Sequence, residues 1–265
     1  MQIDLTDKVA VVTGGSRGIG AATVKLLAAA GARVVFNYRQ NVGAAKAVEK
    51  AVADAGGKAL AVRADVSKMA GAKRLIDAAV SLPHGSLSHG KKSARIDILV
   101  ANAGIWNSDP APIDKMTERQ WDEMMAINLK GVYTAIRQAT PHMIRQKAGR
   151  IIVVSSTAGQ RGEAFHTHYG ASKGGVISLV KGLSTELAPH NILVNCVAPG
   201  WVDTDMCLAV TTNPEELSKV SAGIPLRRLA RPEEIAMPIL FLASEMASYI
   251  TGEILNVNGG NVLCG

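Results

Sequence analysis

The chain has 265 residues with neither an N-terminal signal core nor an apolar stretch long enough to cross a bilayer, so we expect no membrane partner. Its three cysteines are few and scattered, which excludes a disulfide framework, indicates no metal site and favours a reducing, cytoplasmic environment. The net charge of +7 favours anionic small molecules or an acidic protein partner, whereas the lack of a reader motif or of basic runs interleaved with aromatic residues argues against nucleic acid.

Short β-branched runs alternate with longer helical stretches along the chain. The runs predict strands at 8–13, 33–37, 58–63, 96–101, 149–155, 191–197 and 253–257. The stretches between them predict helices at 18–30, 41–55, 67–81, 117–147, 169–188, 206–220 and 232–244. The strands are apolar nearly throughout, as in sheets covered on both faces. We therefore expect one α/β domain over residues 1–265, a Rossmann-type, doubly wound parallel sheet of about seven strands with helices on both faces.

One segment does not fit this alternation. Residues 82–95, LPHGSLSHGKKSAR, are rich in glycine, serine, histidine and lysine and predict an exposed loop before the fourth strand. A loop that enters a strand lies at the edge of the sheet opposite the carboxyl ends, where ligands bind. We therefore expect a solvated insertion that is remote from the site, with a partner contact as the alternative.

A glycine-rich turn, TGGSRGIG at 13–20, joins the first strand to the first helix. Glycine allows a tight turn and close backbone approach, and the N–H groups at the start of a helix attract a pyrophosphate. The pattern is GxxxGxG rather than the more general GxGxxG, so an ordinary glycine turn remains an alternative. The residues expected to form the cradle are Gly14, Ser16, Arg17, Gly18, Ile19 and Gly20.

The end of the second strand, FNYRQ, bears on the choice of dinucleotide. NAD sites commonly carry an acidic residue here that binds the ribose hydroxyls, whereas this chain has Tyr38 and Arg39. Arg17 and Arg39 together would pair with a 2′-phosphate, since guanidinium groups suit bidentate phosphate contacts. We therefore expect NADP(H) to be preferred over NAD(H), unless both side chains point into solvent.

A phenol and an ammonium stand four residues apart at Tyr169 and Lys173. On a helix this spacing places them on one face, where a cation stabilises a phenolate and lowers the pKa of the phenol. Such a phenol is suited to proton transfer near neutral pH. Ser156, at the end of the run IIVVSS, is a candidate partner. From spacing alone, Tyr169 and Lys173 could equally be ordinary surface residues, and Ser156 could merely cap the end of a strand.

Taken together, these motifs resemble the classical short-chain dehydrogenase/reductase family over almost the whole chain. The matching segments are TGGSRGIG at 13–20, DV at 65–66, ANAG at 101–104, IN at 127–128, SS at 155–156, YGASK at 169–173, PG at 199–200 with Thr204, and NVNGG at 256–260. The subgroup that looks nearest is the β-ketoacyl-acyl-carrier-protein reductases, with ketone reductases and sugar or alcohol dehydrogenases close behind.

The resemblance implies roles for four residues. Tyr169 would be the general acid, and Lys173 would lower the pKa of Tyr169 and bind the nicotinamide ribose. Ser156 would hold the substrate oxygen, and Asn128 would order a water that links Lys173 to solvent. These groups suit the chemistry, because an alkoxide formed from a carbonyl needs a proton and local hydrogen-bond donors.

The resemblance implies that Tyr169 and Lys173 also contact the cofactor. It implies nine further cofactor contacts: Asp65 and Val66 at the adenine, Asn102, Ala103 and Gly104 at the adenosine ribose, and Pro199, Gly200, Val202 and Thr204 at the nicotinamide. Two positions depart from the family pattern, since Ala101 replaces an asparagine and Asn258 an aspartate. The cofactor half would be roughly 1–150 and the catalytic half roughly 151–265.

The implied function is NADPH-dependent reduction of a carbonyl to a secondary alcohol, with 3-oxoacyl-[acyl-carrier-protein] reductase as the first interpretation. The alternatives are an NAD(P)-dependent dehydrogenase of a sugar, secondary alcohol or other small ketone, and, more remotely, a non-catalytic dinucleotide sensor. The substrate would be a small carbonyl compound or an acyl thioester, with an acyl carrier protein as a candidate partner. The resemblance implies a homotetramer built through helices 117–147 and 169–188 and the final strand.

The substrate region carries weaker signals. Trp106 and the stretch 206–220 are expected to border the substrate, with Pro214 and Pro225 bracketing a helical lid. His166 and His168 lack a third metal ligand nearby and are interpreted as pocket-wall or surface residues. The basic residues that could meet an acidic carrier are Arg145, Lys147 and Arg150 in one group and Arg227, Arg228 and Arg231 in another, while His190 stands where carrier-binding members often show arginine.

Overall fold

The computed structural model describes residues 3–82 and 95–263. Their strands form a single sheet in the order β3-β2-β1-β4-β5-β6-β7, and every neighbouring pair is parallel. The strands are β1 (Val9–Val12), β2 (Arg33–Tyr38), β3 (Lys58–Arg63), β4 (Ile98–Ala101), β5 (Gly149–Val154), β6 (Ile192–Pro199) and β7 (Ile254–Val257). The order reverses between β1 and β4, and this reversal leaves a crevice outside the carboxyl ends of the strands.

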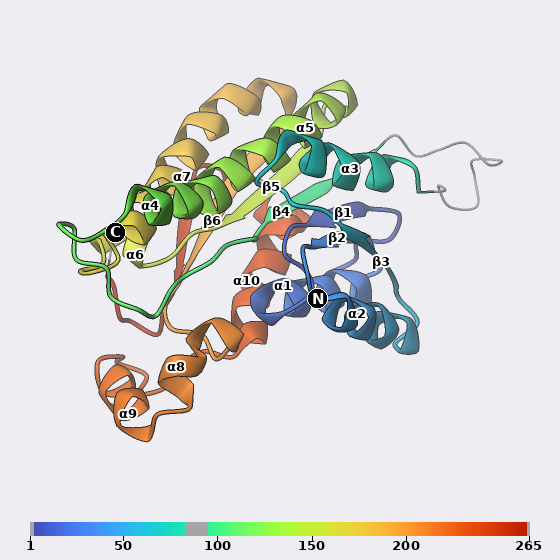
Figure 1. Cartoon of the computed structure of the whole chain (residues 1–265). Helices are drawn as coiled ribbons and strands as arrows, with labels where there is room; N and C mark the ends of the chain where they lie inside the picture. The colour runs from blue at the N-terminus through green and yellow to red at the C-terminus, as the bar shows by residue number, and fades with distance from the viewer. Residues whose placement is uncertain (1–2, 83–94, 264–265) are drawn as a thin grey trace.

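Helices cover both faces of the sheet (Figure 1). One face carries α1 (Gly18–Ala29), α2 (Val42–Asp54) and α10 (Pro232–Ala243), and the other carries α3 (Met69–Val80), α5 (Gly131–Gln146) and α7 (Thr167–Leu187). The shorter helices are α4 (Glu118–Met125), α6 (Ala158–Arg161), α8 (Leu208–Thr211) and α9 (Pro214–Ala222). In Figure 1, α8 and α9 project from one end of the sheet.

Alternate residues of each strand serve the two faces, because successive side chains of a strand point to opposite sides. On β1, Ala10 and Val12 pack in the cluster under α1, α2 and α10, whereas Val9 and Val11 pack in the cluster under α3, α5 and α7. All four side chains are fully buried. The apolar strands of the sequence are therefore the middle layer of a three-layer α/β/α fold, and the predicted fold class is confirmed.

The predicted helix at 206–220 is wrong as one element. It is divided into a 3₁₀ turn (Asp205–Cys207), α8 and α9. Pro214 stands at the first turn of α9, where its missing N–H costs nothing, whereas inside a continuous helix it would break the hydrogen-bond ladder. Asn213 caps α9 by accepting from the N–H groups of Glu215 and Glu216 at 3.1 and 3.3 Å.

The predicted helix at 117–147 contains an irregularity. It begins at a capping box formed by Thr117 and Gln120, but a π-helical turn at Ala126–Lys130 separates α4 from α5. Single π turns inside α-helices occur frequently at functional sites. This one contains Asn128.

The 82–95 insertion falls mostly outside the described residues, which omit 83–94. Its expected distance from the site therefore stays a prediction.

Candidate active site

A cavity of about 650 Å³ opens at the carboxyl ends of the strands. Its walls come from the segments that follow β1, β2, β3, β4, β5 and β6. All of the residues predicted to contact the cofactor line it, together with Ser156, while Asn128 lies behind the wall with a fully buried side chain. The structure thus brings together residues that are spread over nearly two hundred positions of the sequence.

The glycine turn is held in place by two asparagines. Asn37 Oδ1 accepts the Gly14 N–H at 2.9 Å, and Asn102 Nδ2 donates to the Thr13 carbonyl at 2.9 Å. Gly14 has a φ of +67°, which favours glycine. At Gly20, a Cβ atom would lie 2.2 Å from the Gly14 carbonyl oxygen. The turn therefore requires glycine both for its conformation and for close packing.

The start of α1 is suited to an anion. Arg17 is the N-cap residue, and its side chain makes no capping hydrogen bond to the first turn. The N–H groups at a helix start point outward and carry the positive end of the helix dipole. A dinucleotide pyrophosphate would supply the missing acceptors, so this end of the cavity fits such a cofactor.

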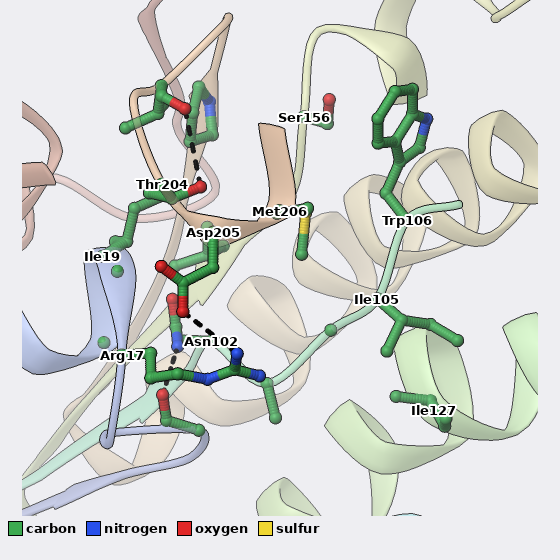
Figure 2. Close-up of a pocket in the computed structure, with 18 of the residues that line it drawn as sticks. Arg17, Ile19, Asn102, Ile105, Trp106, Ile127, Ser156, Thr204, Asp205 and Met206 are labelled. Atoms are coloured by element: carbon green, nitrogen blue, oxygen red, sulfur yellow. Dashed lines mark hydrogen bonds and ion pairs between the residues drawn. The ribbon is translucent and has the colours of Figure 1, made fainter. Parts of the chain in front are cut away.

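The two predicted phosphate-binding arginines differ in their surroundings. Arg17 Nη1 lies 3.0 Å from Asp205 Oδ2, in an exposed ion pair that spans from the glycine turn to the segment after β6 (Figure 2). Arg39 is exposed, lines the cavity and forms no ion pair within residues 3–82 and 95–263. Because exposed ion pairs contribute little free energy, Arg17 remains available to a phosphate. Arg39 would bind a phosphate without first breaking an ion pair of the described residues.

One carboxylate oxygen of Asp65 already accepts hydrogen bonds within the loop that follows β3. Its Oδ1 accepts the N–H and the hydroxyl of Ser67 at 3.0 and 2.7 Å. The side chain lines the cavity, as predicted for a residue at the adenine. Its contact with the adenine stays a prediction.

Tyr169 and Lys173 lie on the first turns of α7, which begins at Thr167. Lys173 is buried, and its Nζ donates to the Val154 carbonyl at 2.9 Å. The same Nζ lies over the Tyr169 ring, 5.9 Å from its centre. Ser155 supports this arrangement by donating to the Lys173 carbonyl at 2.9 Å.

The predicted lowering of the Tyr169 pKa is wrong for this structure. Burial raises the pKa of Tyr169 to about 12, against a smaller lowering by a hydrogen bond with Ser156. Burial likewise lowers the pKa of Lys173 to about 8, because desolvation disfavours both charged forms. Tyr169 is therefore protonated at neutral pH, which is the state that a proton donor requires.

Asn128 has a contact that the sequence did not suggest. Its Oδ1 accepts the Ile105 N–H at 2.8 Å, and its Nδ2 donates to the Ile105 carbonyl at 2.9 Å. Nδ2 also lies 3.2 Å from Ser172 Oγ. The amide thus fixes the segment after β4 against α7, while its role in a water chain to Lys173 stays a prediction.

Aromatic rings meet at one end of the cavity. Trp106 stacks on His166, with ring centres 5.2 Å apart, and meets Trp201 edge-on at 5.8 Å. Both tryptophans line the cavity. Trp106 therefore borders the cavity as predicted. His166 lies just before α7 and His168 lies on α7, and the sequence predicts pocket-wall or surface residues at both positions. Both are buried, so the surface alternative is wrong, whereas His166 does stack on a ring of the cavity wall.

The expectation that Arg145, Lys147 and Arg150 help to ring the mouth of this cavity is wrong within one chain. They lie around the end of α5 and the start of β5, at the amino edge of the sheet, whereas the cavity lies at the carboxyl edge. His190 follows the 21-residue helix α7 and also lies away from its start. Near α10, Arg228 is paired with Glu234 at 2.6 Å.

Several residues of the cavity were missed by the sequence analysis. Asn37 was passed over although it lies in the same segment as Tyr38, and Trp201 although it lies in the predicted segment PGWVDT. Met206 and Cys207 are the only residues of the expected 206–220 border that reach the cavity within the described chain. Arg161 and Glu163, joined by an ion pair of 2.7 Å, also line it, and no motif pointed to them.

Residues 3–82 and 95–263 offer neither a metal site nor a helix that could span a membrane. They contain no group of three histidine, cysteine or carboxylate side chains arranged to hold a metal ion. None of their helices combines the length and the apolar character that a bilayer crossing requires.

Known proteins match almost the whole chain. A family model described as Enoyl-(Acyl carrier protein) reductase matches residues 14–261. A 3-oxoacyl-[acyl-carrier-protein] reductase of Synechocystis sp. is 40% identical over 260 residues, which cover 98% of each chain. An acetoacetyl-CoA reductase of the same organism is also 40% identical, over 98% of this chain and 99% of the relative.

The backbone of this chain is also similar to that of a solved structure. A candidate NAD(P)-dependent gluconate 5-dehydrogenase of Beutenbergia cavernae, crystallised with NADP at low occupancy, superposes with a TM-score of 0.87. It is 34% identical, and the match covers 97% of this chain and 98% of that one. The relatives thus share one fold but act on different substrates.

Proposed function

This chain belongs to the short-chain dehydrogenase/reductase family of oxidoreductases, and from that premise we propose that it reduces a β-ketoacyl thioester to the β-hydroxyacyl product with NADPH. One observation carries the proposal: the start of α1, which has no side-chain cap, lines the same cavity as Ser156, Tyr169 and Lys173. A dinucleotide cradle and a placed proton donor are the two parts that carbonyl reduction needs.

The nicotinamide of the bound cofactor supplies a hydride. The residues of the chain would supply position and a proton. Ser156 would hold the substrate oxygen by a hydrogen bond and orient the carbonyl. Tyr169, protonated because its pKa is raised to about 12, would give its proton to the developing alkoxide. Lys173, held by the Val154 carbonyl, would stabilise the phenolate that remains.

The relatives support the acyl substrate. Their printed names include both a 3-oxoacyl-[acyl-carrier-protein] reductase and an acetoacetyl-CoA reductase at the same identity, so the carrier could be a protein or coenzyme A. The net charge of +7 suits either anionic carrier. A sugar or simple alcohol substrate is the second candidate, favoured by the structural likeness to the gluconate dehydrogenase.

A substrate panel tests the proposal. NADPH oxidation would be followed with acetoacetyl-CoA, an acetoacetyl carrier protein, a simple ketone and a keto-sugar. We expect the thioesters to give the highest kcat/KM. Higher values for the sugar would replace the acyl proposal with the second candidate, and no turnover of any carbonyl with bound NADPH would indicate a non-catalytic sensor.

We further propose that NADPH is preferred over NADH because of Arg39. Changing Arg39 to Asp removes a charge-assisted contact and adds repulsion toward a 2′-phosphate, so the NADPH-to-NADH ratio of kcat/KM should fall by at least about tenfold. The ratio would be measured with one carbonyl substrate. Arg63→Asp, at an exposed position outside the cavity lining, is the matched control. An unchanged ratio in Arg39→Asp would show that Arg39 faces solvent.

We also propose that the chain forms a homotetramer, one of whose interfaces uses α4 and α5. A shallow groove there is lined by Met125, Ala126, Leu129 and Tyr133 together with the charged Asp122 and Lys130, and Tyr133 is 47% exposed. Light scattering coupled to gel filtration should give four times the 27.7 kDa chain mass. A monomer mass at micromolar concentration would contradict this assembly. The cytoplasmic location stays a prediction.

A further inference from the structure

We infer that the substrate carries a flat aromatic group beside its carbonyl, which stacks on a wall formed by Trp106 and Trp201. This inference rests on the proposed function, because it concerns the substrate of the same site. Both side chains line the cavity that contains Ser156 and Tyr169. Figure 2 draws Ser156, Trp106 and Met206 among the residues that line this cavity. A group attached to the carbonyl carbon would lie against this wall.

The wall consists of aromatic rings that contact one another and border the cavity. Buried His166 covers part of Trp106, with ring planes 30° apart, and Trp201 stands nearly perpendicular at 87°. Trp106 remains only partly buried, and it lines the cavity. Trp201 lines the cavity as well, so both indoles border it, and aromatic rings contact one another favourably through their faces and edges.

The backbone that carries Trp106 is also fixed. Both polar groups of the preceding residue, Ile105, are bound by Asn128 at 2.8 and 2.9 Å. Asn128 is itself held in the π-helical turn and lies near Ser172 of α7. Little ordering of the wall is therefore needed when a ligand binds, and preorganised surfaces bind with a smaller entropic cost.

The lining of this cavity also contains apolar side chains. Ile105 precedes Trp106 in the chain and lines the cavity, as do Met206 and Cys207. Arg161 Nη2 and Glu163 Oε2, which also belong to the lining, are joined at 2.7 Å. A flexible alkyl chain would gain apolar burial but not ring stacking, so an aryl group exploits the wall most fully.

Two β-keto esters that differ only at the keto carbon test the inference. Ethyl benzoylacetate carries a phenyl group where ethyl acetoacetate carries a methyl group. We expect the intact protein with NADPH to prefer the phenyl compound about tenfold in kcat/KM. In Trp106→Leu, which keeps apolar bulk but removes the ring, the phenyl-to-methyl ratio should fall about three- to tenfold. Trp106→Phe should give an intermediate ratio, and it serves if the leucine variant does not fold.

The control is Trp121→Leu, because Trp121 lies on α4 outside the cavity lining. The ratio of two substrates does not depend on the amount of active protein, so a loss of stability alone leaves it unchanged. A phenyl-to-methyl ratio below one, or one that Trp106→Leu and Trp106→Phe leave unchanged, would overturn the inference while the proposed function stands. Reduction of neither ester nor of acetoacetyl-CoA, despite NADPH binding, would instead remove the proposed function.

Discussion

Replacing Tyr169 with phenylalanine is expected to lower the rate of carbonyl reduction about a thousandfold, within the range that general acids contribute. The substitution removes one oxygen atom and keeps the ring that Lys173 faces at 5.9 Å. NADPH binding should change little, since the cradle at Gly14–Gly20 is formed by other residues. The measurement pairs single-turnover reduction of acetoacetyl-CoA with NADPH binding by fluorescence.

A fully exposed tyrosine provides the control for this variant. Tyr249→Phe removes the same atom from a side chain that is 103% exposed and lies outside the cavity, so its rate should equal that of the intact protein. A Tyr169→Phe variant that kept most of its rate would show that the proton comes from another group. Loss of NADPH binding together with activity would show that the phenol also holds the cofactor.

Replacing Lys173 with methionine is expected to remove most activity, on the order of a hundredfold, yet to stabilise the fold. Burial lowers the Lys173 pKa from 10.5 to about 8, and this difference corresponds to a cost of about 3 kcal/mol for keeping the charge in the folded protein at pH 7. Methionine fills similar space without that charge. The Val154 carbonyl loses its donor, which costs about 1 kcal/mol, so the net gain should be about 2 kcal/mol.

The gain should depend on pH in a defined direction. Below pH 8 both folded and unfolded wild type carry the charge, and the penalty is fully present. Between pH 8 and 10.5 the folded lysine is neutral while the unfolded one still binds a proton, so wild-type stability from this group rises with pH. The advantage of Lys173→Met should therefore shrink across this range. The pKa of Tyr169 is raised to about 12, so the folded phenol stays protonated across this pH range.

Urea unfolding at pH 7 and 9.5, at one protein concentration, measures the effect. Lys181→Met is the matched control, because Lys181 lies on the same helix α7 but is exposed. We expect that control to show no pH-dependent difference from wild type. A Lys173→Met variant that was less stable than wild type at pH 7, or whose difference did not vary with pH, would show that the lysine charge is not costly here.

The amino-acid pattern predicted the framework well because its signals are local. Apolar runs of strand length and the glycines at 14, 18 and 20 each depend on neighbours a few positions away. The break at Pro214 was equally local and was missed, since the helical pattern of the surrounding residues was given more weight than the proline. The same local logic explains why the bounds of most elements agree within a few residues.

The properties of the site depended on distant contacts. Spacing placed Tyr169 beside Lys173 but carried no information on desolvation, which reversed the expected direction of the Tyr169 pKa. Likewise, the ion pair of Arg17 with Asp205 joins residues 188 positions apart.

By itself, the sequence determined the layers of this protein, the glycine turn and the identities of the candidate catalytic groups, because hydrophobic period and backbone conformation are set by neighbouring residues. Only the tertiary structure decided which groups are buried, which polar atoms they meet and which aromatic rings border the cavity. The physical reason is that burial and charge partners come from segments that the sheet order brings together, such as β4 with α7 across the Asn128 amide.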